Sequence, residues 1–481
     1  MNKMRNCIII CLLLFAWQGC SKKTPSAPDT EKSILEQNTA NLNPQHLAEE
    51  MIQQIGWEID AQAVEEAGII PSLKKSHPGL VSRYLREPLP GNIAHYTFIV
   101  RTGSGPYDEI GIHRVVKEKR AFAPIKSSRN LFLQHGDAKD FTGIFQPGIR
   151  SANTADEHGI AWFLADSDVD VWGIDQAWTL VPSGMSDVSF MADWGLDRQV
   201  ADLSFALSIA RFSRLLTGAG SEPMILSGYS SGVVTGYALL NEETQLAEKA
   251  RNVRGFIPVD LGLKLSDPYL KGFFADYGKN ALQLIANGQA CEEVAFQPLG
   301  YLARTDPDGA SPILSGMTNM QAALLFAGGQ VFGEGSTFHY IAAKLENGMP
   351  VSLHKISIHQ WLDFLEASVA YEPWKFEADY CALFADASET KFDDHVAEIT
   401  VPIFNVAAAG GIGELSRYGT TLLGSSDITH LIVQLGATST LEEFGHIDLF
   451  TAENAPILVW QPILDWIRSH SSVPRYMIKM D

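Results

Sequence analysis

The segment Met224–Gly232 constrains the fold of this chain more than any other. It reads Met-Ile-Leu-Ser-Gly-Tyr-Ser-Ser-Gly, an apolar run that leads straight into a G-x-S-x-G turn. Such a turn presents a serine at a sharp junction between a strand and a helix, where the backbone is strained and the flanking residues must be small. Gly228 and Gly232 meet that requirement, and good helix formers follow. The segment therefore predicts strand, turn and helix, with Ser230 as a candidate nucleophile.

Ser231 is the competing hydroxyl in the same turn. It occupies the position whose backbone N–H serves an oxyanion hole when the preceding serine is the nucleophile. A helix N-terminus also favours developing negative charge at that point. We therefore assign nucleophilic attack to Ser230 and an oxyanion N–H to Ser231.

Strands and helices are expected to alternate around this turn. A hairpin of two strands comes first, and an amphipathic helix over 197–216 precedes the turn, with apolar residues three and four positions apart. The further expected strands are Asn130–Gln134, Asp170–Ile174, Val253–Val259, Val401–Ala407 and Leu431–Leu435. This rhythm predicts an α/β fold, a mostly parallel, doubly wound sheet with helices on both faces.

The rhythm stops after the strand that ends at Val259. Residues 263–397 contain helical patches, such as Asn319–Phe326 and Phe338–Leu345, but no second parallel array. We interpret 263–397 as a large helical lid inserted into a core made of residues 46–262 and 398–481. A closing helix is expected over Ile457–Arg468.

The N-terminus has the pattern of an export signal. Lys3 and Arg5 precede an apolar run that is too short to span a bilayer. The Gly19-Cys20 junction predicts a lipoprotein signal over residues 1–19, lipid on Cys20, and a polar tether over 20–45. Ordinary signal cleavage is the alternative. We expect an exported protein, anchored to a membrane or located in the periplasm or at the cell surface.

Composition excludes several classes of partner and site. The formal net charge of -20 argues against nucleic acid, which requires a basic footprint. No C-x-x-C or H-E-x-x-H spacing occurs, so no metal and no cofactor are expected. In an exported protein Cys291 and Cys381 could form one disulfide or stay as two thiols.

A serine needs a general base and an acid that orients the base. His446 is the candidate base, because it follows the last expected strand and would return to the sheet edge where Ser230 lies. Two acids fit the chain order, Asp260 at the end of one strand and Glu414 in a glycine-rich loop after the next. We favour Asp260, because a carboxylate that closes an apolar strand needs a partner such as an imidazole.

The second oxyanion donor is expected from the turn His135-Gly136-Asp137 at the end of another strand, through a backbone N–H near Asp137. His135 is expected to shape this turn. The Asp137 carboxylate should point away, because negative charge beside an oxyanion would oppose it.

These motifs resemble the α/β-hydrolase superfamily, and within it the lipase branch that includes the acid (gastric and lysosomal) lipases. The resemblance lies in Leu133-Gln134-His135-Gly136, in Ala161-Trp162-Phe163-Leu164-Ala165 before Asp170-Val171-Trp172, and in Gly445-His446-Ile447-Asp448. It implies that Ser230 is the nucleophile and His446 the base. The family usually has an aspartate in the loop that here reads Gly410-Gly411-Ile412-Gly413-Glu414, and its absence strengthens Asp260.

We therefore expect an exported, lipid-anchored serine hydrolase that cleaves carboxylic esters, including lipid esters, through an acyl-enzyme. A hydrolase-fold lipoprotein that only binds a lipid or other ligand is one alternative, and the missing loop aspartate favours it. An acyltransferase with the same triad is another, because hydrolysis and acyl transfer use the same residues.

Overall fold

The computed structural model describes residues 43–67, 80–332, 336–413, 415–437 and 439–471. The expected signal, the lipidated Cys20, nearly all of the tether and the alternative acid Glu414 lie outside these ranges. Within them, no helix is both long and apolar enough to cross a lipid bilayer.

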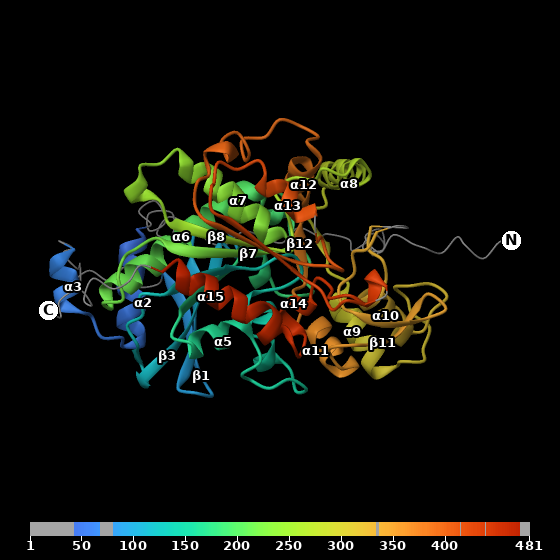
Figure 1. The fold of residues 1–481 in the computed structure, drawn as a ribbon, viewed down its shortest axis with the longest axis horizontal. Coiled ribbons are helices and arrows are strands. Elements are labelled where there is room, and N and C mark those ends of the chain that lie inside the picture. Colours follow the sequence, from blue (N-terminus) through green and yellow to red (C-terminus); the bar gives the residue numbers. More distant parts are fainter. Residues whose placement is uncertain (1–42, 68–79, 333–335, 414, 438, 472–481) are drawn as a thin grey trace.

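A ten-stranded sheet forms the centre of the molecule (Figure 1). Its strand order is β1-β2-β3-β6-β5-β7-β8-β13-β14, and β4 pairs with β3. The first three pairings along this order are antiparallel, and all those from β6 to β14 are parallel. The strands are β1 Val81–Leu89, β2 Ile93–Arg101, β3 Glu109–Arg120, β4 Ala123–Pro124, β5 Asn130–Gln134, β6 Asp170–Asp175, β7 Met224–Tyr229, β8 Val253–Val259, β13 Ile403–Ala408 and β14 Ile428–Val433.

Helices cover both faces of the sheet (Figure 1). One face carries α2 Pro44–Ile55, α6 Leu196–Leu216 and α7 Ser231–Thr244, and the other carries α5 Ile160–Asp166 and α15 Gln461–Ser469. The strands alternate accordingly: Leu226 packs with the first set and Ile225 with the second. The predicted doubly wound α/β fold is confirmed.

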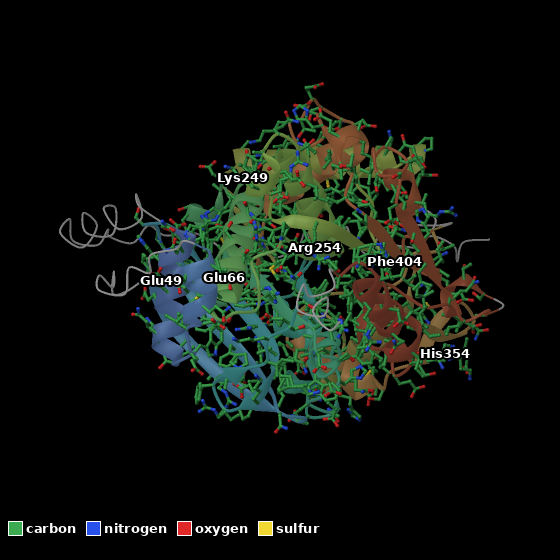
Figure 2. All side chains as sticks on the ribbon, turned by 60° about the vertical axis from the view of Figure 1, so that its left-hand side comes forward. Glu49, Glu66, Lys249, Arg254, His354 and Phe404 are labelled. Atoms are coloured by element: carbon green, nitrogen blue, oxygen red, sulfur yellow. The ribbon has the colours of Figure 1, made fainter. Side chains whose placement is uncertain are left out.

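The segment between β8 and β13 includes His354, which lies on the opposite side of the molecule from Glu49 and Glu66 of the N-terminal helices (Figure 2). In the described residues it contains five α-helices, one short 3₁₀ helix at Val396–Glu398, and two small antiparallel sheets, β9 with β12 and β10 with β11. The helices are α8 Pro268–Ala286, α9 Phe296–Thr305, α10 Asn319–Gly328, α11 Ile358–Glu366 and α12 Trp374–Ala385, and the strands are β9 Cys291–Glu293, β10 Ala343–Glu346, β11 Met349–Leu353 and β12 Tyr371–Pro373.

One helix expected in this segment is wrong. Residues 338–342 are irregular, and β10 begins at Ala343. The backbone N–H groups of Tyr340 and Ile341 both donate to the Ala327 carbonyl at the end of α10, so they cannot form helical hydrogen bonds. The apolar side chains here pack against neighbouring elements instead of forming one face of a helix.

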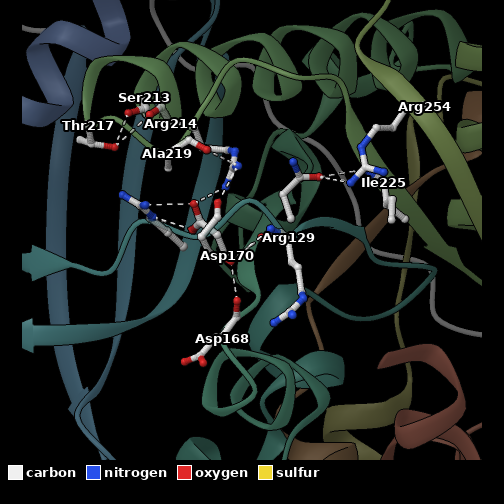
Figure 3. A network of polar contacts seen from close by, with 12 residues as sticks. Arg129, Asp168, Asp170, Ser213, Arg214, Thr217, Ala219, Ile225 and Arg254 are labelled. Carbon is white, nitrogen blue, oxygen red and sulfur yellow. Dashed lines mark hydrogen bonds and ion pairs between the residues drawn. The ribbon is translucent and has the colours of Figure 1, made fainter. Parts of the chain in front are cut away.

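A buried ion network ties α6 to the sheet. Asp170 at the start of β6 accepts hydrogen bonds from Arg114 of β3 at 2.8 and 3.0 Å and from Arg214 of α6 at 2.6 Å. Figure 3 shows Arg214 reaching Asp170 from the helix through Nη1. Nη2 of Arg214 donates to the carbonyls of Ser127 and Ala219. All three charged side chains are buried. Burial alone would raise the pKa of Asp170, but the two guanidinium groups hold it below its usual range.

Candidate active site

Ser230 lies between β7 and α7 with φ 53° and ψ -131°. A non-glycine residue with positive φ is strained, and such strain concentrates at functional sites. The flanking glycines allow the turn: a Cβ on Gly228 would come within 2.4 Å of the Gly232 carbonyl oxygen, and one on Gly232 within 2.3 Å of the His135 oxygen. The backbone therefore has the strand, strained serine and helix that the G-x-S-x-G spacing predicts.

His446 follows β14 in a loop that returns to the carboxyl edge of the parallel strands. Its imidazole stacks on the Tyr229 ring, with centroids 4.6 Å apart, and Nδ1 lies 2.6 Å from Oδ2 of Asp260. The Tyr229 hydroxyl donates to the His446 carbonyl oxygen at 3.2 Å. These contacts fix both the plane of the ring and the nitrogen that faces the acid.

Asp260 follows the last residue of β8 and is fully buried. While Oδ2 faces His446, Oδ1 accepts the backbone N–H groups of Ala408 at 2.9 Å and Ile412 at 3.2 Å. Gly411 makes room for this carboxylate, because a Cβ there would come within 2.0 Å of Oδ2. The structure thus brings Asp260 to His446, and the loop after β13 supplies backbone donors to the acid instead of an aspartate of its own.

Ser230 and His446 line the same cavity. Within the described residues no hydrogen bond joins the Ser230 hydroxyl to the imidazole. In free enzymes such contacts are often long and tighten when substrate binds. The site therefore contains a preformed His446–Asp260 pair beside a strained serine.

The turn after β5 lies directly against the nucleophile. A Cβ on Gly136 would come within 2.6 Å of the Ser230 Cβ and 2.7 Å of the Tyr229 carbonyl oxygen, so only glycine fits. Nε2 of His135 accepts the backbone N–H of Gln176 at 3.1 Å, which leaves Nδ1 to donate to the Gly136 carbonyl at 2.8 Å. Both ring nitrogens of His135 are thus engaged in holding the turn.

The orientation expected for Asp137 is wrong. Its carboxylate lines the cavity, where Oδ1 accepts a hydrogen bond from the Ser231 hydroxyl. It also lies within hydrogen-bonding reach of the Glu372 carboxyl. Burial raises the pKa of Asp137, and the hydrogen bond from Ser231 opposes this shift. The expectation failed because it considered only the charge of Asp137 and not the hydrogen bond that Ser231 offers to it.

Asp448, two residues after His446, bonds to backbone N–H groups and not to the imidazole. Its Oδ2 accepts the backbone N–H groups of Ala342 at 2.7 Å and Gly445 at 2.8 Å. Burial raises the pKa of Asp448 to about 7. It joins the His446 loop to the inserted segment.

The cavity beside Ser230 has a volume of about 160 Å³. Its walls are mostly aromatic and come largely from the inserted segment, including Phe273, Tyr277, Phe296, Phe332, Phe364 and Tyr380. Three further carboxyl groups line it: Glu292, Glu372 and Glu377. Sequence reasoning missed these glutamates, because no motif or strand end marks them.

The possible disulfide is not formed between Cys291 and Cys381, both of which the structure describes. Cys291 begins β9, whereas Cys381 is buried in α12. There it packs against α8 at Gly278, where an added Cβ would come within 3.0 Å of the Cys381 Cβ.

Comparisons with known proteins find similar solved structures but no similar sequence. No model of a protein family matches it, and no similar sequence was found among curated proteins. One similar solved structure is described as a "putative lipase from Sulfolobus solfataricus". It is 17% identical with a TM-score of 0.54, and the match covers 80% of this chain and 99% of that one.

Two further solved structures are similar at lower TM-scores. An esterase from Thermogutta terrifontis is 12% identical with a TM-score of 0.37, over 81% of this chain and 100% of its own. A laboratory-evolved variant of a potato epoxide hydrolase is 11% identical with a TM-score of 0.41, over 80% and 100%. The strand order, the strained Ser230 turn between β7 and α7, and the first of these matches together show that the chain has the α/β-hydrolase fold.

Proposed function

We propose that this protein is a serine hydrolase that cleaves carboxylic esters through an acyl-enzyme. The observation that carries the proposal is the strained Ser230 in one cavity with the hydrogen-bonded His446–Asp260 pair. The fold shared with the similar lipase structure is consistent with it, although many activities occur on this fold.

The steps follow from the positions of these residues. His446 removes the Ser230 proton as Oγ attacks the ester carbonyl carbon, and Asp260 stabilises the imidazolium through Nδ1. The backbone N–H groups of Ser231 and Asp137 receive the oxyanion. His446 then protonates the leaving alcohol, and a water activated by the same imidazole releases the acid.

The aromatic cavity supports an acyl or alcohol group of substantial apolar area. We further propose export and lipid attachment at Cys20, on the sequence pattern of residues 1–20. Mass spectrometry of the membrane-extracted protein tests this part separately: a diacylated N-terminal Cys20 supports it, and an intact N-terminus contradicts it.

Turnover of p-nitrophenyl esters of increasing acyl length tests the hydrolase proposal. We expect hydrolysis by the wild type and a loss of about 10³-fold or more in Ser230→Ala, because the oxyanion hole alone leaves little catalysis. Ser231→Ala keeps the nucleophile and is the matched control, with a smaller loss. Folded protein that hydrolyses no ester would contradict the proposal and favour a protein that only binds its ligand.

A further inference from the structure

Four carboxyl groups converge in the cavity beside the nucleophile: those of Asp137, Glu292, Glu372 and Glu377. One carboxylate oxygen from each of Asp137, Glu372 and Glu377 lies within 4.8 Å of the others. We call these four residues the acidic pocket. They come from the loop after β5, from β9, from β12 and from α12, so four separate elements direct a carboxyl group to one place.

No described lysine or arginine forms an ion pair with any member of the acidic pocket. Lys139 lines the same cavity, but its ammonium group donates to the Phe364 carbonyl and lies 3.6 Å from the centre of the Phe364 ring. The partners of the pocket are the Ser231 hydroxyl, the Ala138 backbone N–H and the hydroxyls of Tyr380 and Tyr277, and Asp137 and Glu372 also bond to each other. The carboxyl groups thus face the cavity without an ion pair to any lysine or arginine that the structure describes.

Glu292 gives an independent sign that this cavity accepts a hydrogen-bond donor. It is only 5% exposed and lines the cavity, and its buried Oε2 has no hydrogen-bond partner. A buried carboxylate oxygen without a partner costs free energy, so such atoms require an explanation. A bound group that donates a hydrogen bond would satisfy it.

We propose that the acidic pocket binds the ammonium group of a positively charged ester substrate. A primary ammonium carries three N–H donors, which suit three carboxylate oxygens that converge from different sides. The aromatic walls add cation–π attraction for the same charge, from rings such as Tyr277 and Tyr380. This inference rests on the proposed function, because it names the substrate class of that site.

The ammonium must lie close to the ester bond. Asp137 accepts its hydrogen bond from Ser231, the residue that follows the nucleophile. Only a short spacer fits between a carbonyl carbon at Ser230 and a cation held by Asp137. We therefore expect amino-acyl esters with a short spacer, or esters of short amino alcohols, to be the preferred substrates.

A monovalent ammonium fits the charge state better than a divalent metal ion. Burial raises the pKa of Glu377 to about 8 and raises those of Glu292 and Glu372 well above the usual range. Burial therefore opposes the accumulation of negative charge in the pocket, and a singly charged ammonium requires fewer ionised carboxyl groups than a divalent ion does. A divalent ion would have to displace more protons and needs six or more oxygen ligands, which aromatic walls do not supply.

Pairs of substrates that differ only in charge test the proposal. The benzyl esters of β-alanine and butyrate have the same shape, with an ammonium in one where the other has a methyl group. The same holds for the esters of 6-aminohexanoate and heptanoate. We expect kcat/KM for the β-alanine ester to exceed that of the butyrate ester about 10-fold to 100-fold, and the ratio to be smaller for the longer pair.

The variants Glu292→Gln and Glu293→Gln form a matched pair on β9. Glu292 faces the cavity, whereas Glu293 is exposed to solvent. Glu292→Gln should lower the ammonium-to-methyl ratio of kcat/KM about tenfold, and Glu293→Gln should leave it unchanged. Because the readout is a ratio, a general loss of folded protein cancels.

Calorimetry with n-butylammonium and 1-butanol separates this proposal from the hydrolase proposal. Binding of the ammonium alone, weakened by Glu292→Gln, supports the acidic pocket even if no ester is hydrolysed. Hydrolysis of both esters at equal kcat/KM, together with equal binding of the two ligands, overturns the pocket and leaves the hydrolase standing. Stoichiometric binding of Ca²⁺ or Mn²⁺ that Glu292→Gln abolishes, without ammonium preference, also overturns it in favour of a metal site.

Discussion

At the scale of single residues, Asp260 connects the base to the backbone of the β13 loop. One of its oxygens faces His446 and the other accepts two backbone N–H groups. Asp260→Asn would place an amide N–H₂ or a neutral oxygen against Nδ1 and disturb the tautomer that catalysis needs. We expect kcat to fall about 10³-fold or more, measured with any ester the wild type hydrolyses.

Asp448→Asn is the control for Asp260→Asn, because Asp448 is equally buried in the same region but bonds to loop N–H groups. Its loss of kcat should be much smaller. Equal losses in the two variants would show that Asp260 is not the acid that orients His446.

Gly411 gives a second prediction at this scale. A Cβ at Gly411 would lie 2.0 Å from the Asp260 carboxylate, so Gly411→Ala must displace the acid or the loop. We expect a loss of kcat of about 10²-fold or more, because a small misplacement of a catalytic group is costly. Gly272→Ala in α8, where an added Cβ meets nothing within 4 Å, should leave kcat unchanged and the midpoint of thermal unfolding equal or higher. Wild-type kcat in Gly411→Ala would contradict the role given to this contact.

Residue identities allowed part of the site to be predicted. Ser230, Asp260 and His446 each follow a strand of a parallel array, and parallel strands bring their carboxyl ends to one edge. Glu292, Glu372 and Glu377 could not be predicted. They belong to a segment without regular periodicity, and only its folding brings them to the cavity.

At the scale of elements, the packing of α6 on the sheet depends on a buried charge network as well as on apolar contacts. Arg214 of α6 and Arg114 of β3 both hold Asp170 of β6. Arg214→Met keeps most of the volume but removes one of the two guanidinium groups from a fully buried carboxylate. We expect the free energy of unfolding in urea to fall by about 3–5 kcal/mol.

The exposed Arg468→Met is the control, because its ion pair with Asp465 is solvated and worth little. Equal unfolding midpoints for the two variants would show that the network adds no stability. Neither residue lies in the cavity, so the proposed ester hydrolysis by the folded fraction should persist in both.

The differences between expected and observed elements also have physical causes. β1 has no counterpart in the sequence-based description, because it is an edge strand with mostly exposed or half-buried positions and lacks a clear apolar alternation. Asn319–Phe326 is helical as expected, whereas Phe338–Leu345 is not. Both segments have apolar residues at helical spacing. In Phe338–Leu345, however, backbone hydrogen bonds to the Ala327 carbonyl replace those that a helix would need.

At the scale of the whole molecule, Ser230, Asp260 and His446, the proposed catalytic residues, follow strands of the sheet, and the inserted segment supplies most of the cavity wall. This division explains why the fold could be predicted while the substrate class could not. Sheet order follows from the alternation of strands and helices along the chain. The proposed specificity depends on cavity side chains from α8, β9, β12 and α12, which meet only in the folded protein.

The central claim is that Ser230 is an activated nucleophile. A fluorophosphonate probe labels serines that a neighbouring base activates, and it requires no knowledge of the substrate. We predict that the folded wild-type protein is labelled, and that Ser230→Ala and heat-unfolded wild type are not. Labelling of Ser230→Ala at the wild-type level, or no labelling of wild type whose fold is intact by circular dichroism, would contradict the account.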